Sequence, residues 1–540
     1  MAKRFGCHIS MGGRGRSATK APERVDPGPH CITLMQCSSP ATHRLYFIAV
    51  SMNLWEQTAD FLRDFWPHVL AGGGFLFEAG CALHAILKKR DTRATISWMG
   101  LIWLTPLIGA VLYVLFGVNR ISRRAKKMRR RRNYVKSAST HAATTPLQIA
   151  DQLGHANARY QPLVNLVGKL AEQPLLSGNT IEPLIDGDQA YPAMLQAIEQ
   201  AEISVSLSSF IFDNDAAGTE FVSALIRARE RGVEVRVLID DVGSRYSWPT
   251  VVGPLRRGGV TVGRFIRTLW PAGFAYSNLR SHRKILVVDG RIGFTGGMNI
   301  RAGTWRKLKA KHPLHDLHFR LSGPVVAQLQ ETMAEDWAFT TREVLEGPKW
   351  FPELSPTGDM LARGVPNGPD EDIGELRSTL IAAIGTAQHR VGILTPYFLP
   401  DDALIEALNI AALRGVRVDI LLPGVNNQRM VHWACKAVLP QVLERGVRVW
   451  YVPGIFDHSK MMIVDDLWSF IGSSNWDPRS LRLNFEFNVE CYDVDFASRL
   501  WQLIDQRLAN AIPVTLESLR QQWFLTTVRN GIARLFTPML

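Results

Sequence analysis

One short pattern occurs twice in this chain, and it limits the possible folds more than any other feature. SHRKILVVDGRIGFTGGMN covers residues 281–299, and DHSKMMIVDDLWSFIGSSN covers residues 457–475. In each copy a histidine is followed by a lysine, an aspartate and an asparagine at offsets of 2, 7 and 17 residues. These residues are His282, Lys284, Asp289 and Asn299 in the first copy, and His458, Lys460, Asp465 and Asn475 in the second. A pattern repeated in this way predicts a duplicated structural unit.

The duplication extends over the residues that precede each pattern. Residues 197–241 and residues 383–424 share one order: a helix, an apolar strand, an Ala- and Leu-rich helix closed by Arg-Gly-Val, and a second apolar strand. Strand–helix–strand units of this length predict layered α/β domains. We therefore expect two tandem α/β domains at 151–345 and 375–540. The Pro, Gly and acidic residues of 346–374 predict a linker between them.

The residue types in the pattern suit a phosphate group. If each pattern begins as a strand, its histidine and lysine share a face, because side chains alternate along a strand. Lysine offers a point charge to a phosphate oxygen, and asparagine donates further hydrogen bonds. We therefore expect the histidine, lysine and aspartate of each copy to be catalytic and the asparagine to bind the phosphate. Two such sets at one phosphorus would let one imidazole attack while the other protonates the leaving alkoxide. The alternative, that each histidine is an ordinary strand-end residue, is disfavoured by the matched offsets.

Each imidazole also needs an acceptor that orients it. Asp316 lies downstream of His282, and Glu486 lies downstream of His458, so we expect each histidine to use the carboxylate of its own half. A metal site is the rival interpretation. The lysine beside each histidine would repel a cation, and the six cysteines show no metal-ligand spacing. The sequence therefore predicts chemistry without a metal or another cofactor.

Two apolar stretches near the N-terminus predict a membrane helix hairpin at 65–118. Residues 94–118 run 25 residues without a charge, which is long enough to span a bilayer core. Residues 65–87 are the weaker candidate because they contain Glu78 and three consecutive glycines. We expect the two helices to pair through the glycines at 72–74 and 80. A buried core helix for the first stretch, and a re-entrant or interfacial segment for the second, are the alternatives.

The positive charge of the chain is confined to two segments. The net charge is +13. Residues 1–51 hold seven basic and two acidic residues, and 120–132 hold nine basic residues and no acid, so the remainder sums to about −1. The basic run, within an expected linker at 119–150, should stay cytoplasmic and touch anionic lipid; a nuclear-localisation or nucleic-acid role is the weaker alternative. Residues 1–51 differ in composition from the rest, and we expect them to be a disordered or mis-assigned extension with Met52 as the start.

The paired H-x-K-x(4)-D pattern resembles the signature of the phospholipase D superfamily over about residues 180–510. Within it, the chain is similar to bacterial cardiolipin synthases over about 65–540, with further likeness in TPYFLPDD and IGSSNWDPRSLRLNFEFNVECYD. The sequence departs from the family at LRSH, where members often have Asn before the histidine. It departs again at HDLHF around Asp316, where many have Trp-Arg-Asp.

The resemblance implies both a fold and a reaction. The fold would be two tandem phospholipase D-like α/β sandwich domains forming one active site behind a membrane hairpin. One phosphatidylglycerol would be attacked at phosphorus, glycerol would leave, and a second phosphatidylglycerol would accept the phosphatidyl group to give cardiolipin. His282 would be the nucleophile and His458 the acid, then the base. The enzyme would be a multi-pass protein of the inner membrane that needs no metal.

Three other functions remain in competition. A nuclease would use the same groups on a phosphodiester, but its catalytic half should be basic, and residues 133–540 sum to about −1. We therefore expect no nucleic-acid partner. A hydrolytic phospholipase D would resolve the same intermediate with water, and the sequence does not separate it from a transferase. A non-enzymatic membrane scaffold is disfavoured by the two intact patterns.

Overall fold

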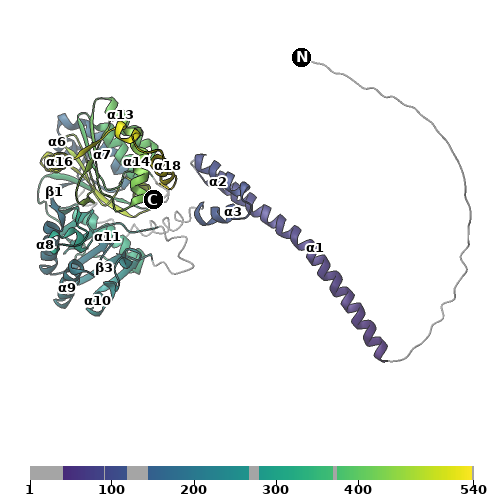
Figure 1. Ribbon diagram of the computed structural model, residues 1–540. Coiled ribbons are helices and arrows are strands. Elements are labelled where there is room, and N and C mark those ends of the chain that lie inside the picture. Colours follow the sequence, from purple (N-terminus) through teal and green to yellow (C-terminus); the bar gives the residue numbers. More distant parts are fainter. Residues whose placement is uncertain (1–39, 90–91, 118–143, 267–278, 369–373, 538–540) are drawn as a thin grey trace, which may run out of the picture. The chain divides into compact units, whose positions relative to one another are not determined.

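The computed structural model describes residues 40–89, 92–117, 144–266, 279–368 and 374–537. It divides into two compact units, Met1–Tyr113 and Val114–Leu540 (Figure 1). The compositionally distinct residues 1–39 and the basic run at 120–132 lie outside the described residues.

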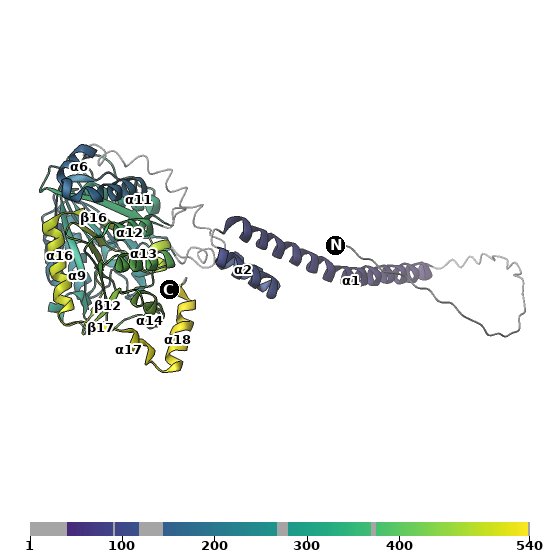
Figure 2. The same ribbon diagram turned by 90° about the horizontal axis from the view of Figure 1, so that it is seen from above.

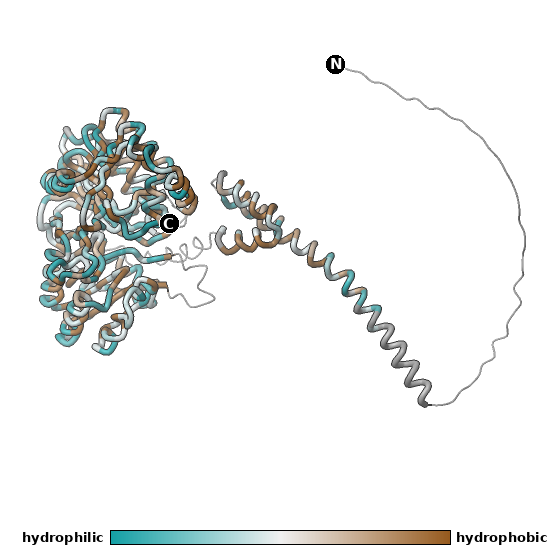
Figure 3. Tube along the Cα trace, in the orientation of Figure 1, coloured by the Kyte–Doolittle hydropathy of each residue, from teal (hydrophilic) through white to brown (hydrophobic). Residues whose placement is uncertain are grey.

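The N-terminal unit is helical. Its helices are α1 (Pro40–Lys88), α2 (Thr92–Leu104) and α3 (Ile108–Leu112). Helix α1 begins upstream of Met52, so the expected boundary at that methionine is not a structural one, and residues 40–51 are helical. The part of α1 from Arg63 to Lys88 is long and apolar enough to cross a bilayer, and Figure 3 shows the apolar colouring of its C-terminal part and of α2 and α3.

The second expected membrane helix, at 94–118, is not one continuous helix. Helix α2 ends at Leu104, and the chain turns through Pro106 before α3 begins. Proline cannot donate to the helix and its ring clashes with the preceding turn, and Leu107 takes a left-handed φ of 61°. The 13 residues of α2 reach only about 20 Å at 1.5 Å per residue, less than the ~30 Å hydrocarbon core.

Helices α2 and α3 form a short hairpin that packs against α1. Contacts at a constant separation of 29 residues join Glu78 to Leu107 and His84 to Tyr113, so α3 runs parallel to α1. The Glu78 carboxylate accepts a 2.6 Å hydrogen bond from the Leu107 N–H at the break, which explains a carboxylate inside an apolar helix. The expected pairing through glycines holds only at residue 74, because a Cβ at 72, 73 or 80 would meet nothing within 4 Å.

The larger unit contains one continuous fifteen-stranded sheet. Its order is β17-β12-β11-β10-β14-β15-β16-β9-β1-β8-β6-β5-β2-β3-β4. Strands and helices of the first half are β1 (Leu176–Ile185), α8 (Asp186–Glu199), β2 (Ser204–Ser209), α9 (Ala216–Glu230), β3 (Glu234–Asp240), α10 (Val252–Arg257), β4 (Thr261–Phe265), β5 (Ile285–Val288), β6 (Ile292–Gly296), β7 (Leu314–His315), β8 (Leu317–Ser322) and α11 (Val326–Thr341).

The second half repeats this series. It comprises β9 (Met360–Asn367), α12 (Glu375–Thr386), β10 (Arg390–Leu394), α13 (Asp402–Leu413), β11 (Arg417–Pro423), α14 (Arg429–Leu443), β12 (Arg448–Val452), β13 (Phe456–Asp457), β14 (Met461–Val464), β15 (Trp468–Gly472), α15 (Pro478–Arg482), β16 (Glu486–Tyr492) and α16 (Val494–Leu508). Helices α6 (Pro146–Leu153) and α7 (Gln161–Ala171) precede β1, and β17 (Ile512–Val514), α17 (Leu516–Arg520) and α18 (Phe524–Leu535) end the chain.

Both predicted strand–helix–strand units are present. β2 pairs parallel with β3, and β10 pairs parallel with β11. Strands β1 and β9 meet antiparallel at the middle of the sheet, so the strand order on one side of this junction mirrors that on the other. The predicted linker at 346–374 is wrong at 360–367, because that stretch is the fully buried strand β9.

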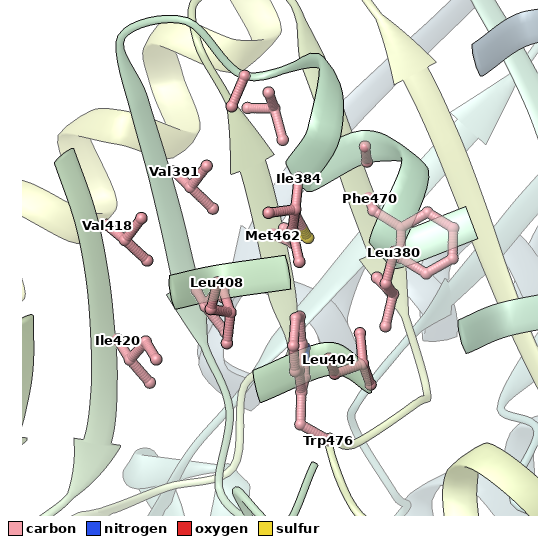
Figure 4. Close-up of a cluster of buried hydrophobic side chains, with 14 of the residues drawn as sticks. Leu380, Ile384, Val391, Leu404, Leu408, Val418, Ile420, Met462, Phe470 and Trp476 are labelled. Carbon is pink, nitrogen blue, oxygen red and sulfur yellow. The ribbon is translucent and has the colours of Figure 1, made fainter. Parts of the chain in front are cut away.

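Helices cover both faces of the sheet (Figure 2). One core lies under α11 and α16 and includes side chains from both halves. On the other face, α8, α9 and α10 cover the first half, and α7, α12, α13 and α14 cover the second (Figure 4). Strand β5 shows the alternation: Ile285 and Val287 belong to the shared core, while Leu286 and Val288 face α8 and α9. The shared core ties the two halves into one unit.

Candidate active site

The two histidines lie where the halves meet. His282 comes just before β5 and His458 just before β14. The His282 N–H donates to the Phe485 carbonyl at 2.8 Å, and the His458 N–H donates to the His315 carbonyl at 2.7 Å. Parallel pairing of β7 with β13 supports the second contact, and a bridge between Ser281 and Phe485 supports the first. Each histidine is therefore held beside the chain segment that precedes the acidic residue of the opposite half.

The carboxylates are exchanged between the halves. His282 Nδ1 lies 2.9 Å from Glu486 Oε2, and His458 Nδ1 lies 2.8 Å from Asp316 Oδ2. The expectation that each histidine uses the acid of its own half is wrong. The backbone hydrogen bonds explain this exchange. Each histidine N–H bonds to a carbonyl of the opposite half, and the acidic residue follows that carbonyl directly in the sequence.

Further contacts hold both carboxylates in place. Glu486 accepts hydrogen bonds from the Ser473 hydroxyl and, at 3.2 Å, from Asn484 Nδ2. Asp316 Oδ1 accepts from the Leu317 N–H at 2.9 Å. A Cβ at Gly297 would come within 2.3 Å of Asp316 Oδ1, so only glycine fits there. Because a carboxylate only accepts, each Nδ1 carries the proton and each Nε2 presents a lone pair.

Burial favours the neutral form of both histidines. Burial lowers the pKa of His282 to about 4, with Glu486 opposing the shift and Lys284 adding to it. Burial and the Lys460 charge lower the pKa of His458 to about 4, against the effect of Asp316. Burial would raise the pKa of Glu486, but His282 and Lys284 hold it below its ordinary value. A neutral imidazole with a free Nε2 is the form that can attack phosphorus.

The two lysines converge on the same place. Lys284 Nζ donates to the His282 carbonyl at 2.6 Å, and Lys460 Nζ donates to the His458 carbonyl and lies 2.9 Å from His458 Nδ1. Burial lowers the pKa of Lys284 to about 7 and that of Lys460 to about 8, and the charge of Lys460 lowers the pKa of Lys284 further. A phosphate diester placed between them would relieve this repulsion. Among the described residues, no group of three or more His, Cys, Asp or Glu could hold a metal ion.

The asparagines flank this centre. Asn299 Oδ1 accepts from the Ile211 N–H at 3.1 Å, which leaves its Nδ2 as the donor for a ligand. Asn475 Oδ1 is buried and has no hydrogen-bond partner within the part of the chain that the structure describes. Asn475 and Lys460 line a small pocket together with Phe470 and Trp476. The site thus offers one unused acceptor and several positive donors.

Comparison with known proteins places this arrangement in a family. The sequence model described as "Cardiolipin synthase, PLD-like domain" matches residues 194–337 and 380–508, and one described as phospholipase D-nuclease N-terminal matches 80–117. The cardiolipin synthase A of Pseudomonas putida strain GB-1 is 34% identical over 461 residues, which is 85% of this chain and 95% of the relative. The chain belongs to the cardiolipin synthase family of the phospholipase D superfamily.

Two further comparisons agree with this membership. The cardiolipin synthase A of Pseudomonas fluorescens strain SBW25 is 34% identical over 481 residues, covering 88% of this chain and 99% of the relative. The crystal structure of phosphatidylserine synthase from Haemophilus influenzae superposes with a TM-score of 0.54 at 15% identity, covering 70% of this chain and all of that one. The second likeness concerns the fold alone.

In this cardiolipin synthase family member, the motif aspartates lie away from the histidines. The Asp289 carboxylate accepts hydrogen bonds from the N–H groups of residues 202–204, and Asp465 accepts from those of residues 388–390. Each lies seven residues from its histidine, beyond the far end of a four-residue strand that is itself about 13 Å long. They fix the hairpin turn to the start of the neighbouring parallel strand. The catalytic role expected for these two residues does not fit this geometry.

Two aromatic residues that the sequence patterns did not indicate lie beside the histidines. The Phe210 ring lies 5.2 Å from the His282 ring, and the Tyr397 ring lies 6.4 Å from the His458 ring. Phe210 comes one residue after β2 and Tyr397 comes three residues after β10, the first strand of each strand–helix–strand unit. Because the two positions differ by one residue in the repeat, an alignment of the two copies would not have paired them. They supply apolar walls next to an otherwise charged centre.

Proposed function

We propose that the chain transfers a phosphatidyl group from one phosphatidylglycerol to another, forming cardiolipin and releasing glycerol. The observation that carries this proposal is the exchanged pairing of His282 with Glu486 and His458 with Asp316. This pairing brings two imidazoles with free Nε2 atoms and two lysines to one centre. The imidazoles can act as nucleophile and acid, and the lysines can balance the phosphate charge, so the proposed reaction uses no metal. Family membership supports the substrate class.

In the first step, the Nε2 lone pair of His282 attacks the phosphorus of one phosphatidylglycerol. A P–N bond forms as the P–O bond to glycerol breaks. Protonated His458 gives its Nε2 proton to the departing glycerol oxygen. The assignment of His282 as nucleophile comes from the family resemblance, because the geometry of the two histidines is nearly equivalent. Lys284 and Lys460 balance the charge on the phosphoryl oxygens.

In the second step, neutral His458 removes the proton from the terminal hydroxyl of a second phosphatidylglycerol. The resulting oxygen attacks phosphorus, the P–N bond breaks, and cardiolipin leaves with His282 restored. His458 then carries the proton required for the next cycle. Free His458 has a pKa of about 4, so binding of the anionic phosphate must raise its pKa for the first step.

A single lipid assay tests the proposal. Purified full-length protein is incubated with phosphatidylglycerol labelled in the glycerol headgroup and, separately, in the acyl chains. Cardiolipin together with one released glycerol per product is the expected result. Phosphatidic acid as the only lipid product would establish hydrolysis instead. Cleavage of a DNA substrate with no lipid product would favour the nuclease alternative.

For localisation, our proposal is an inner-membrane protein with its catalytic half on the cytoplasmic side. The nine basic residues at 120–132 follow the re-entrant α2–α3 hairpin and favour the cytoplasm. Arg63–Lys88 of α1 is long and apolar enough to cross a bilayer, and in this proposal it makes the single crossing while α2 and α3 enter the membrane and return to the cytoplasmic side. A reporter fused after Leu540 should behave as cytoplasmic, and one fused before α1 as periplasmic. Two cytoplasmic reporters would instead mean that 94–117 completes a second crossing.

A further inference from the structure

The last helix of the chain is amphipathic, but its apolar side is turned away from the protein. Helix α18 packs on α14 through the buried residues Ala533 and Asn530, and the Arg529 guanidinium lies 4.5 Å from the centre of the Trp433 ring. A surface helix ordinarily packs its apolar stripe on the core. Here the stripe is exposed, and we call it the C-terminal apolar face: Trp523, Phe524, Leu525, Val528, Ile532 and Leu535.

The exposure of this face is large. Trp523 is 71% exposed, Phe524 is 73% and Leu535 is 78%. At 100° per residue, the five members within α18 fall in a sector of about 100°, so they form one continuous strip. Contiguous exposed apolar patches of this kind indicate a binding surface.

Exposed apolar residues also lie near the start of α14, the helix on which α18 packs. Val425 lies just before α14 and Met430 lies in its first turn, and both are exposed. Between them, Asn427 accepts a 2.7 Å hydrogen bond from the Tyr397 hydroxyl, and the Tyr397 ring lies beside His458. The helix that carries α18 therefore begins next to a residue that contacts the catalytic centre.

The first half contributes a matching projection. Trp248 is 87% exposed and Tyr246 is 58% exposed, in the segment that follows β3 just as residues 424–428 follow β11. The Tyr246 ring lies 6.3 Å from Phe210, which in turn lies against His282. Apolar side chains therefore project from both halves near the two histidines.

We propose that α18 is an interfacial helix that seats the catalytic half on a lipid bilayer, with the C-terminal apolar face at the boundary between headgroups and acyl chains. This use of the site rests on the proposed function, in which both reactants are membrane lipids. Trp and Phe with Leu on one face and arginine on the other are typical of helices that lie in the membrane interface. With α18 bound in the interface, the phosphodiester of a membrane lipid could reach the histidines without leaving the bilayer.

Charge favours a lipid surface over a second copy of the chain. Residues 516–537 contain Arg520, Arg529 and Arg534 but only one acid, Glu517. Anionic headgroups would neutralise the arginines, at about 1 kcal/mol for each side chain near the surface. Two copies packed through this face would instead bring like charges together. The bilayer is therefore the occupant that the composition of the helix fits.

Photocrosslinking in membranes identifies the occupant directly. A benzophenone amino acid replaces Val528 in the full-length chain, and the matched control carries it at Thr527, which is exposed on the flank of the same helix, about 110° from the centre of the apolar strip. After irradiation with radiolabelled phosphatidylglycerol in the membrane, we expect several-fold more lipid adduct at position 528 than at 527. A dimer-sized adduct at 528, an adduct to another segment of the same chain, or equal lipid labelling at both positions would each overturn the proposal.

An activity ratio separates this surface from the chemistry. Turnover is measured with phosphatidylglycerol in vesicles and with a short-chain, monomeric analogue. Val528→Glu should lower the ratio of vesicle to monomer activity about tenfold, while Thr527→Glu should leave the ratio within twofold of wild type. An unchanged ratio in Val528→Glu would refute the proposal that α18 binds the bilayer interface. If the wild-type protein turned over neither substrate, the proposed function would be wrong. The crosslinking experiment would then still test membrane binding by α18, because it does not depend on turnover.

Discussion

Each histidine pairs with the carboxylate of the opposite half, and mutation of the two carboxylates can distinguish this arrangement from pairing within each half. Asp316→Asn should impair His458, and Glu486→Gln should impair His282. Each substitution replaces a buried charge-assisted hydrogen bond of 2.8 or 2.9 Å. Such a bond is worth about 1.5–3 kcal/mol, or about 10–150-fold in rate. An amide can also donate to Nδ1 and move the proton to Nε2, and the equivalent change in the serine protease triad costs about 10⁴. We expect losses between about 10² and 10⁴ with phosphatidylglycerol for both variants.

The leaving group separates the two histidines. A phosphatidyl nitrophenol needs no acid, because nitrophenolate departs unprotonated. Rapid-quench trapping of the phosphatidyl enzyme with this substrate should show near wild-type formation in Asp316→Asn, whose defect lies in the acid. Glu486→Gln should remain slow, because its nucleophile is affected. Thermal unfolding of both variants controls for loss of fold.

The opposite pattern would refute the reasoning. If Glu486→Gln recovered with the activated substrate and Asp316→Asn did not, either the pairing or the assignment of the nucleophile would be reversed. The site of label decides which: label on His458 would reverse the assignment of the nucleophile, whereas label on His282 would contradict the exchanged pairing. Equal recovery in both variants would remove the division of roles altogether.

Three further predictions concern stability. Asp465→Asn weakens hydrogen bonds to residues 388–390 and should lower the free energy of unfolding by about 1–3 kcal/mol, with wild-type turnover per folded molecule in a denaturation-corrected assay. Arg363→Met leaves the buried Glu490 without its ion-pair partner and should cost about 3–5 kcal/mol in urea unfolding, whereas adding Glu490→Leu should recover most of it. Burial lowers the pKa of His318 to about 3. Below about pH 6.5 this histidine is protonated in the unfolded chain but not in the folded chain. The free energy of unfolding therefore decreases as the pH falls from about 6.5 towards 3. His318→Phe should retain about 2 kcal/mol more than wild type on moving from pH 8 to pH 5, and parallel pH curves of the two proteins would contradict this.

Local signals in the sequence predicted the repeat well. The two strand–helix–strand units and the turn at Asp289 and Gly290 depend on residues close together in the chain, and periodicity and turn chemistry report such neighbours. The convergence of both histidines and both lysines also followed from the matched offsets. Strand β9 was missed because its Pro and Gly residues suit a loop, and only pairing with β1 and β16 makes it a strand.

Long-range partners were beyond the sequence. His282 and Glu486 are separated by 204 residues, and nothing in either motif indicates which half supplies the carboxylate. The motif aspartates were expected to be catalytic because they recur at the same offset in both copies of the pattern. Each of them also lies at a turn, and in the structure its carboxylate bonds to backbone N–H groups of the neighbouring chain segment. In the N-terminal unit, counting uncharged residues favoured 94–118 over 65–87. The bond from Glu78 to the Leu107 N–H, which compensates the buried carboxylate, is visible only in three dimensions.

The exchanged carboxylates also determine when this chain becomes reactive during its synthesis. His282 and Lys284 leave the ribosome long before Glu486, the last member of the centre to be translated. Until β16 has added to the sheet, the first histidine has no carboxylate at Nδ1, and the second half is equally incomplete without the first. On the proposed function, a nascent or prematurely terminated chain that ends before β16 should therefore be chemically inert towards phospholipids.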